Sequence, residues 1–290
     1  ARQRLATLAD AFLMHNRDIH TRCDDSVMRI STANTPSPLR RSRGYAPFPV
    51  KLGWEMPPTL AVGGELKNTF CLANGRYAFL SPHIGDLQNY ETLQSFEDGI
   101  AHFEQLFRVQ PSLIAYDAHP NYLASRYAIA RAEREGTTAV SVQHHHAHIA
   151  ACMAEHGLDG TEPVIGVAFD GTGYGDDGRI WGGEFLVADY AGYKRPFHLN
   201  YFPMAGGDTA VREPWRLALA CLHQAGIAWD DDLPPMQHAH RAATHDLAAI
   251  VRHQLQNNVN APQTSSMGRL FDAVSALIGV RQTVNYEAQA

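Results

Sequence analysis

The segment from Ala139 to Gly157 constrains the fold of this chain more than any other part of its sequence. A short apolar run over 139–142 has the composition of a buried strand, and four histidines follow it at positions 144, 145, 146 and 148. Apolar residues continue at helical spacing from 149 to 153, and Gly157 is placed to end that helix. Such a strand-to-helix junction is typical of α/β folds, in which ligands bind at the carboxyl ends of the strands.

Two of these histidines form a candidate metal site. His144 and His148 are four residues apart, so a helix places both imidazoles on one face. Two neutral imidazoles at this spacing can chelate one divalent metal ion. The alternative is an ordinary surface cluster in a chain that has 16 histidines. Because the glutamate of a metalloprotease His-Glu-x-x-His motif is absent, the spacing alone leaves both interpretations open.

The composition excludes several classes of protein. With 290 residues, 45% of them hydrophobic, the chain can bury a sizeable core, and we expect two lobes. The net charge of −6 argues against a basic surface for nucleic acid. No apolar run reaches the roughly 18 residues that would predict a membrane span. The four cysteines are far apart and form no Cys-x-x-Cys pair, which favours reduced thiols in the cytoplasm.

The order of the predicted elements indicates a duplicated α/β fold. The first lobe is expected to contain strands 59–64, 68–72 and 77–80, helix 89–108, strand 113–116, helix 122–135, and strand 139–142 with its helix. Asn74-Gly75 predicts a hairpin turn between the second and third strands. Three meandering strands followed by crossover strands form the lobe of actin, hexokinase and the heat-shock chaperone ATPases.

A second copy of the pattern is expected after residue 160. It would contain strand 164–169, a glycine-rich turn over 170–175, strands 180–190 and 193–202, and helices 209–225, 239–256 and 266–279. Its last two crossover strands are not predicted before residue 290, so we expect an incomplete second lobe and a longer polypeptide.

Proline-rich composition and the repeated pattern set the expected domain limits. An amphipathic helix is expected over 1–15, within a first segment that ends at residue 50. A proline-containing linker over 51–58 would join it to the first lobe, 59–160, and the truncated second lobe would cover 161–290.

Glycine-rich segments after the first strand of each lobe predict a phosphate site, because backbone amides approach an anion closely where side chains are absent. The candidates are Gly63, Gly64, Gly171, Thr172, Gly173 and Gly175. Asp170 could hold a metal ion or orient a water molecule, and Lys67 could neutralise a phosphate. The alternative is that both segments are ordinary hairpins, since neither is a Walker A loop or a Rossmann fingerprint.

Five motifs resemble those of the HypF family of carbamoyltransferases, which acts in nickel–iron hydrogenase maturation. They are Ala61-Val-Gly-Gly-Glu-Leu-Lys-Asn68, Asp117-Ala-His-Pro120, Val142-Gln-His-His-His-Ala-His148, Phe169-Asp-Gly-Thr-Gly-Tyr-Gly175 and Ser266-Met-Gly-Arg-Leu-Phe-Asp-Ala273. Residues 59–290 resemble the carbamoyl-transfer domain of that family, and residues 1–50 resemble the end of the α/β YrdC-like domain that precedes it.

The resemblance implies a reaction and its partners. Carbamoyl phosphate and ATP would form carbamoyladenylate in the YrdC-like domain, and the carbamoyl group would pass to the C-terminal cysteine of HypE for cyanide ligand synthesis. His144 and His148 match the ligands of a divalent metal ion, iron or zinc, and a further aspartate ligand is expected outside this chain. The expected catalytic residues are Lys67, Asp117, His119 and Asp170.

Three other functions remain open on the sequence alone. One is O-carbamoylation of a small molecule by a related enzyme, and another is a kinase-like ATPase of the same fold, which needs no metal-binding histidine pair. The third is an inactive fragment that binds its partner without turnover. The cytoplasm is the expected location, with no membrane and no nucleic acid as partners.

Overall fold

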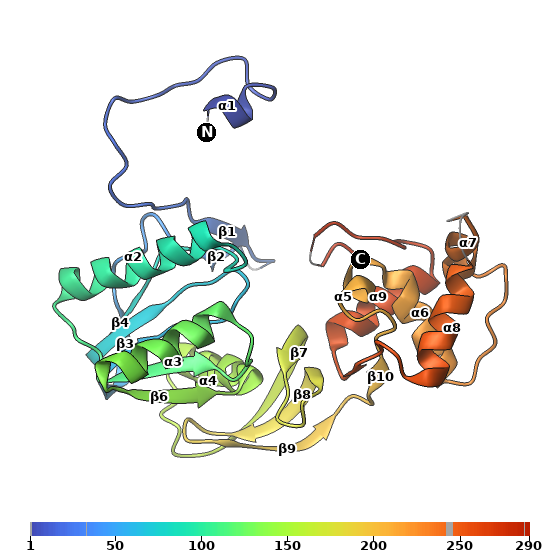
Figure 1. Cartoon of the computed structure of the whole chain (residues 1–290). Helices are drawn as coiled ribbons and strands as arrows, with labels where there is room; N and C mark the ends of the chain where they lie inside the picture. The colour runs from blue at the N-terminus through green and yellow to red at the C-terminus, as the bar shows by residue number, and fades with distance from the viewer. Residues whose placement is uncertain (1, 33, 242–245, 287) are drawn as a thin grey trace.

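The computed structural model describes residues 2–32, 34–241, 246–286 and 288–290 (Figure 1). Two mixed sheets organise the chain, and the helices α5 to α9 gather at the end away from the first sheet, with β7, β8 and β9 between them. The predicted α/β fold is confirmed. In the part of the chain described here, every helix is too short or too polar to cross a membrane.

The first sheet has the strand order β4-β3-β5-β6. Its strands are β3 (Val50–Ala61), β4 (Cys71–Leu80), β5 (Leu113–Asp117) and β6 (Thr138–Val142). Strand β4 is antiparallel to β3, whereas β5 and β6 run parallel to β3 and to each other. Because β5 and β6 are parallel, both end at the same edge, and Asp117 lies opposite Val142 there.

Two helices cover this sheet and enclose its core. Helices α2 (Tyr90–Phe107) and α3 (Leu123–Glu135) match the predicted helices 89–108 and 122–135. Phe70 of the loop before β4 packs edge-to-face against Phe96 and Phe103 of α2, and all three rings are buried. Asn89 caps α2 by accepting a hydrogen bond of 2.9 Å from the Thr92 N–H.

Helix α4 (His144–Glu155) follows β6 but packs on the second sheet. That sheet has the order β10-β11-β8-β7, and β9 also pairs with β8. Its strands are β7 (Val164–Tyr174), β8 (Ile180–Ala188), β9 (Tyr193–His198), β10 (Phe202–Pro203) and β11 (Gln263–Thr264). Ile149 and Met153 of α4 are buried against Leu186 of β8. The histidines at the start of α4 therefore lie where the two sheets meet.

The last helices form a separate layer beside β7. They are α5 (Asp208–Arg212), α6 (Pro214–Gln224), α7 (Pro234–Arg241), α8 (Leu247–Asn257) and α9 (Met267–Leu277). Pro214 begins α6, so the helix expected over 209–225 is divided into two. The helix expected over 239–256 falls partly on residues 242–245, which lie outside the described residues.

The linker predicted over 51–58 is wrong, since these residues lie inside β3. Its two prolines, Pro57 and Pro58, fall between Met56 and Thr59, where the pairing of β3 with β4 is irregular. A strand tolerates a residue without an N–H at such a position. Composition alone therefore gave a misleading boundary.

The hairpin turn predicted at Asn74-Gly75 is also wrong, because both residues lie inside β4. Gly75 has a φ of +58° and pairs with Met56, at a point where the register shifts. A glycine with positive φ is typical of a bulge within a continuous strand. The strands expected at 68–72 and 77–80 are therefore one strand, and two strands rather than three precede α2.

The chain before β3 contains little regular structure. It comprises α1 (Arg2–Leu5) and a hairpin of β1 (Val27–Ile30) with β2 (Pro36–Arg40). Of the helix predicted over 1–15, residue 1 is not described, and the helix ends at Leu5. The apolar side chains of Leu8 and Leu13 are exposed, so no packing supports a longer helix.

The second sheet lacks the two crossover strands of the predicted pattern within the described residues, and β7 forms its edge. The outward apolar side chains Ile165, Val167 and Phe169 of β7 are exposed. The limits at 50 and 58 both fall inside β3, whereas the limit at 160 and the YrdC-like character of residues 1–50 remain predictions.

Candidate metal centre

Gln143 caps helix α4 and ties it to the second sheet. Its side-chain Oε1 accepts hydrogen bonds from the N–H groups of His145 (2.7 Å) and His146 (3.0 Å). Its Nε2 donates to the carbonyl oxygen of Tyr174, at the end of β7, over 3.1 Å. The start of α4 is thereby fixed relative to β7.

Three side chains converge at this junction. The ligand atoms of His144, His148 and Asp170 all lie within 4.8 Å of one another. The Asp170 Oδ2 atom of β7 lies 3.2 Å from His144 Nε2, 3.8 Å from His148 Nε2 and 3.6 Å from the Nε2 of the fully buried His145. The Nε2 atoms of His144 and His148 are 3.2 Å apart. One helix thus supplies two imidazoles and the neighbouring strand supplies a carboxylate.

The protonation states reflect this crowding. Burial raises the pKa of Asp170, but the hydrogen bonds from His144 and from the Gly171 N–H outweigh it and lower the pKa to about 2. Burial lowers the pKa of His144, but its hydrogen bonds to Asp117 and Asp170 outweigh that effect and raise the pKa to about 9. Asp170 is therefore ionised at neutral pH, whereas His144 without a metal ion is a positively charged imidazolium, protonated on both ring nitrogens.

The other two imidazoles are neutral. Burial, followed by repulsion from the charge on His144, lowers the pKa of His145 to about 4. The same two causes, in the same order, lower the pKa of His148 below its ordinary value. Neutral imidazole is the form that binds a metal ion.

The residues fit the predicted metal ion. His145 Nε2 is buried and has no hydrogen-bond partner among the residues that the structure describes, and the buried Asp170 Oδ2 faces the Nε2 atoms of three histidines, of which His144 is the nearest at 3.2 Å. An unsatisfied buried polar atom costs on the order of 1–3 kcal/mol, so this arrangement calls for an explanation. Two imidazoles and a carboxylate form a donor set of zinc and iron sites. The resemblance placed an aspartate ligand outside this chain, yet Asp170 already supplies a carboxylate within it.

Two further predicted residues lie beside the three donors. The Asp117 Oδ2 atom is 2.7 Å from His144 Nδ1. The His119 ring stacks on Tyr122 with 3.9 Å between ring centroids, and its other neighbour is Tyr174 of β7, at 5.4 Å. Tyr122, which the sequence did not single out, thus joins His119 and Tyr174 in a group of rings beside the three donors.

Lys67, Gly63 and Gly64 lie in the loop between β3 and β4. The Asn68 side chain holds this loop closed by donating hydrogen bonds to the carbonyl oxygens of Val62 (2.9 Å) and Gly64 (2.6 Å). Gly63 has a φ of +72°, and a Cβ there would lie 2.3 Å from a backbone carbonyl oxygen. The loop therefore requires glycine for its own conformation, and its binding of phosphate remains a prediction.

The glycine-rich turn predicted over 170–175 is wrong, because β7 continues to Tyr174. Its glycines make room for neighbouring side chains. A Cβ on Gly173 would lie 2.4 Å from His145 Cε1, and one on Gly175 would lie 2.1 Å from Trp181 Nε1. Thr172, between Gly171 and Gly173, is exposed. Gly173 hence lets β7 lie against the start of α4, whereas Gly175 makes room for Trp181 of β8.

A cavity of about 440 Å³ begins at Gly171, the residue after Asp170. Helix α9 supplies most of its polar lining, namely Arg269, Asp272 and Ser275. Arg269 Nε, Asp272 Oδ2 and Ser275 Oγ have no hydrogen-bond partner in the described part of the chain, although Arg269 Nη2 lies 3.1 Å from Asp272 Oδ2. Sequence reasoning assigned these residues no role. The motif 266–273, which contains Arg269 and Asp272, was the available signal for two of them.

Comparisons with known proteins agree with this architecture. Residues 55–155 match the family model "HypF Kae1-like domain", and residues 166–290 match "Carbamoyltransferase, Kae1-like Domain, second subdomain". The chain is 47% identical over 292 residues to carbamoyltransferase HypF2 of Cupriavidus necator, and 42% identical over 290 residues to carbamoyltransferase HypF of Rhizobium leguminosarum bv. viciae. Each match covers 100% of this chain, but only 35% and 36% of the respective relatives.

Two solved structures share the fold. A crystal structure of full-length HypF in the phosphate- and nucleotide-bound form superposes with a TM-score of 0.87 at 43% identity, over 99% of this chain and 36% of that one. The crystal structure of T.kodakarensis HypF gives a TM-score of 0.80 at 35% identity, over 92% of this chain and 36% of that one. The chain therefore belongs to the HypF family of carbamoyltransferases.

Proposed function

We propose that this chain provides the carbamoyl-transfer site of a HypF-type carbamoyltransferase. One observation carries the proposal: the donors His144, His148 and Asp170 meet directly beside a cavity that begins at Gly171. Adjacent residues of β7 thus connect a metal site with a cavity whose lining includes Arg269, Asp272 and Ser275. A reaction that needs both a Lewis acid and a bound nucleotide fits this arrangement.

The proposed reaction has two stages. In a YrdC-like domain, water hydrolyses carbamoyl phosphate to carbamate and phosphate, and a carbamate oxygen then attacks the α-phosphorus of ATP, which gives carbamoyladenylate and releases pyrophosphate. The thiolate of the C-terminal cysteine of HypE then attacks the carbamoyl carbon, the bond from that carbon to the adenylate oxygen breaks, and AMP leaves. The carbamoylated cysteine would serve cyanide ligand synthesis in hydrogenase maturation, in the cytoplasm.

The three donors would hold a divalent ion, iron or zinc, through the Nε2 atoms of His144 and His148 and the Oδ2 atom of Asp170. When bound, the ion supplies Lewis-acid polarisation of the carbamoyl carbonyl. His145 remains neutral and packs behind the donors. The His119 and Tyr122 rings would shield one side of the centre from water.

The cavity along α9 is the proposed adenylate site. The planar guanidinium of Arg269 suits a phosphate group, and the Asp272 carboxylate suits the hydroxyl groups of a ribose. The absence of a side chain at Gly171 would allow its backbone to approach the phosphate. Gly63, Gly64 and Lys67 remain proposed contacts for phosphate from the first lobe.

The test is carbamoylation of HypE itself. Full-length protein is incubated with HypE, carbamoyl phosphate and ATP, and intact HypE is then measured by mass spectrometry. We expect the mass of one carbamoyl group on its C-terminal cysteine, lost when that cysteine is replaced by serine. Transfer to a small hydroxyl compound, with HypE unchanged, would instead favour O-carbamoylation.

Metal affinity should depend strongly on pH. Because the pKa of His144 is raised to about 9, a proton must leave this imidazole before the metal binds. We therefore expect zinc affinity to rise about tenfold per pH unit from near pH 6.5 towards pH 9. Competition titration against a chelator of known affinity, at several pH values, measures this. A flat profile would show that His144 does not release a proton on binding.

A further inference from the structure

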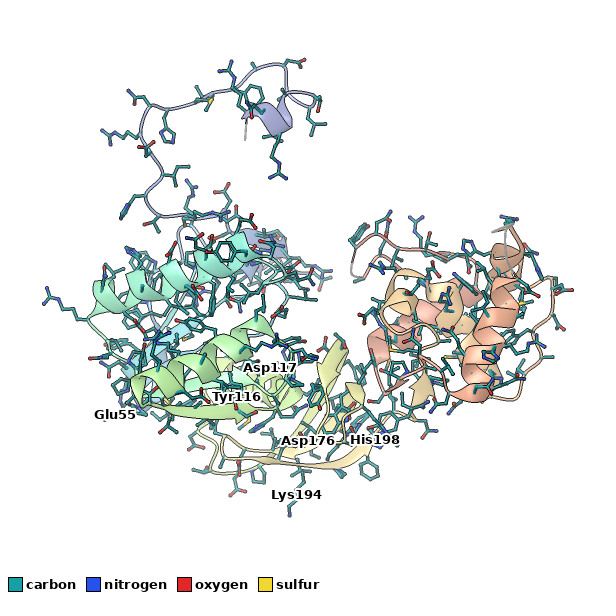
Figure 2. The ribbon with its side chains drawn as sticks, in the orientation of Figure 1. Glu55, Tyr116, Asp117, Asp176, Lys194 and His198 are labelled. Atoms are coloured by element: carbon teal, nitrogen blue, oxygen red, sulfur yellow. The ribbon has the colours of Figure 1, made fainter. Side chains whose placement is uncertain are left out.

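Asp117 occupies a fixed place beside the metal centre. It is the last residue of β5, and parallel pairing sets it opposite Val142, the last residue of β6. The N–H of Ala118 donates a hydrogen bond of 3.0 Å to the Val142 carbonyl oxygen, so the two strand ends cannot slide past each other. Figure 2 shows Asp117 at the end of β5, where the first sheet approaches β7.

Each carboxylate oxygen of Asp117 has one partner. Oδ1 accepts a hydrogen bond of 2.8 Å from the His119 N–H, and Oδ2 lies 2.7 Å from His144 Nδ1. The backbone oxygen of Asp117 accepts a further hydrogen bond of 2.8 Å from the Ser125 hydroxyl. The Asp117 side chain is only 8% exposed. The carboxylate is therefore held in one orientation, with Oδ2 directed at the imidazole.

We infer that Asp117 is a positioning residue, which holds the His144 imidazole in the orientation and tautomer that bind the metal ion. An ionised carboxylate can only accept, so the proton of the neutral imidazole resides on Nδ1. The Nε2 lone pair is then free on the side where Asp170 Oδ2 lies, 3.2 Å away. This role differs from the catalytic role that the resemblance implied, and it rests on the proposed metal centre.

Asp117→Asn is the informative variant because asparagine has the same shape but only one acceptor oxygen. That oxygen cannot serve the His119 N–H and the His144 Nδ1–H together. When it serves His119, the amide N–H₂ faces His144 and favours the tautomer with its proton on Nε2, which blocks the metal. Loss of a carboxylate behind a metal-bound histidine typically weakens affinity about 10–100-fold.

The experiment measures zinc affinity and the absorption spectrum of the cobalt(II) form in full-length protein. We expect Asp117→Asn to weaken zinc binding about 10–100-fold and to alter the cobalt bands. Asp159→Asn is the matched control, since Asp159 also accepts a hydrogen bond from the N–H two residues later but is exposed and contacts no imidazole. We expect wild-type affinity for that control.

A double variant separates positioning from loss of the fold. If Asp117 acts through His144, Asp117→Asn should not reduce further the weak zinc affinity that His148 and Asp170 retain in a His144→Ala background, measured by titration at high zinc concentration. A further loss there, or wild-type affinity and spectrum for Asp117→Asn alone, would overturn the inference. The proposed metal centre itself fails by a different result, namely wild-type protein that binds no zinc or His144→Ala that binds it normally.

Discussion

Replacing either His144 or His148 by alanine should remove the metal ion and abolish carbamoyl transfer to HypE, while adenylate formation continues. Each variant leaves one imidazole with Asp170, and two donors hold an ion much more weakly than three. Polarisation by a metal ion contributes several kcal/mol to a barrier, so we expect transfer to fall by on the order of 10³-fold or more. Metal content, HypE mass and pyrophosphate release are measured on the same full-length preparations.

Pyrophosphate release distinguishes the possible results of that experiment. It reports adenylate formation, which is proposed to occur in another domain, and should stay at the wild-type level. His156→Ala is the control, because His156 lies just after α4, is exposed, and directs its ring at Cys152. Stoichiometric metal in both variants would refute the ligand assignment. If pyrophosphate release falls together with transfer, the division of labour between domains is wrong.

The sequence predicted the elements whose signals are local. The helix α2 has an asparagine cap at Asn89 and apolar residues at helical spacing, and both signals lie within the helix itself. His144 and His148 were found for the same reason, since one helix carries both and its period sets their separation. Neither prediction required knowledge of which distant segments meet.

The predictions that failed depended on distant partners. Pro57 and Pro58 predicted a linker, but they lie in β3, where the pairing with β4 is irregular and tolerates proline. The segment 171–175 was predicted to be a turn, because the side chains that need its space, His145 and Trp181, are not adjacent to it in sequence; its binding of phosphate remains a prediction. Composition reveals that a residue is small, but only the packed fold shows what the small residue makes room for.

The cavity was missed for a related reason. Its polar groups come from α9, and α9 is anchored to β7 by the Ser266 hydroxyl, which donates to the backbone oxygens of Asp170 (2.8 Å) and Gly171 (2.9 Å). Ser266 also caps α9 by accepting from the Arg269 N–H. A capping serine can be recognised in a sequence, but its hydrogen bonds to the distant β7 backbone become visible only in the folded structure.

Gly173→Val should disable the metal centre and destabilise the fold. A Cβ at this position would lie 2.4 Å from His145 Cε1 and 3.1 Å from His144 Cδ2. His145 is fully buried and has no room to withdraw, so both imidazoles must shift. A phosphate-binding role of this segment alone would instead predict lost nucleotide binding with an intact fold. Overpacking of this kind costs about 1–3 kcal/mol of unfolding free energy, and zinc affinity should fall with it.

Gly53→Val is the matched control, because Gly53 also lies within a strand but has open space around its Cβ position. Urea unfolding of both variants measures the unfolding free energy, and zinc titration measures the zinc affinity. If Gly173→Val kept wild-type stability and zinc affinity but lost nucleotide binding, the segment would be a phosphate site after all. The expected pattern is the reverse, because the first atoms that a new side chain meets at position 173 belong to the histidines.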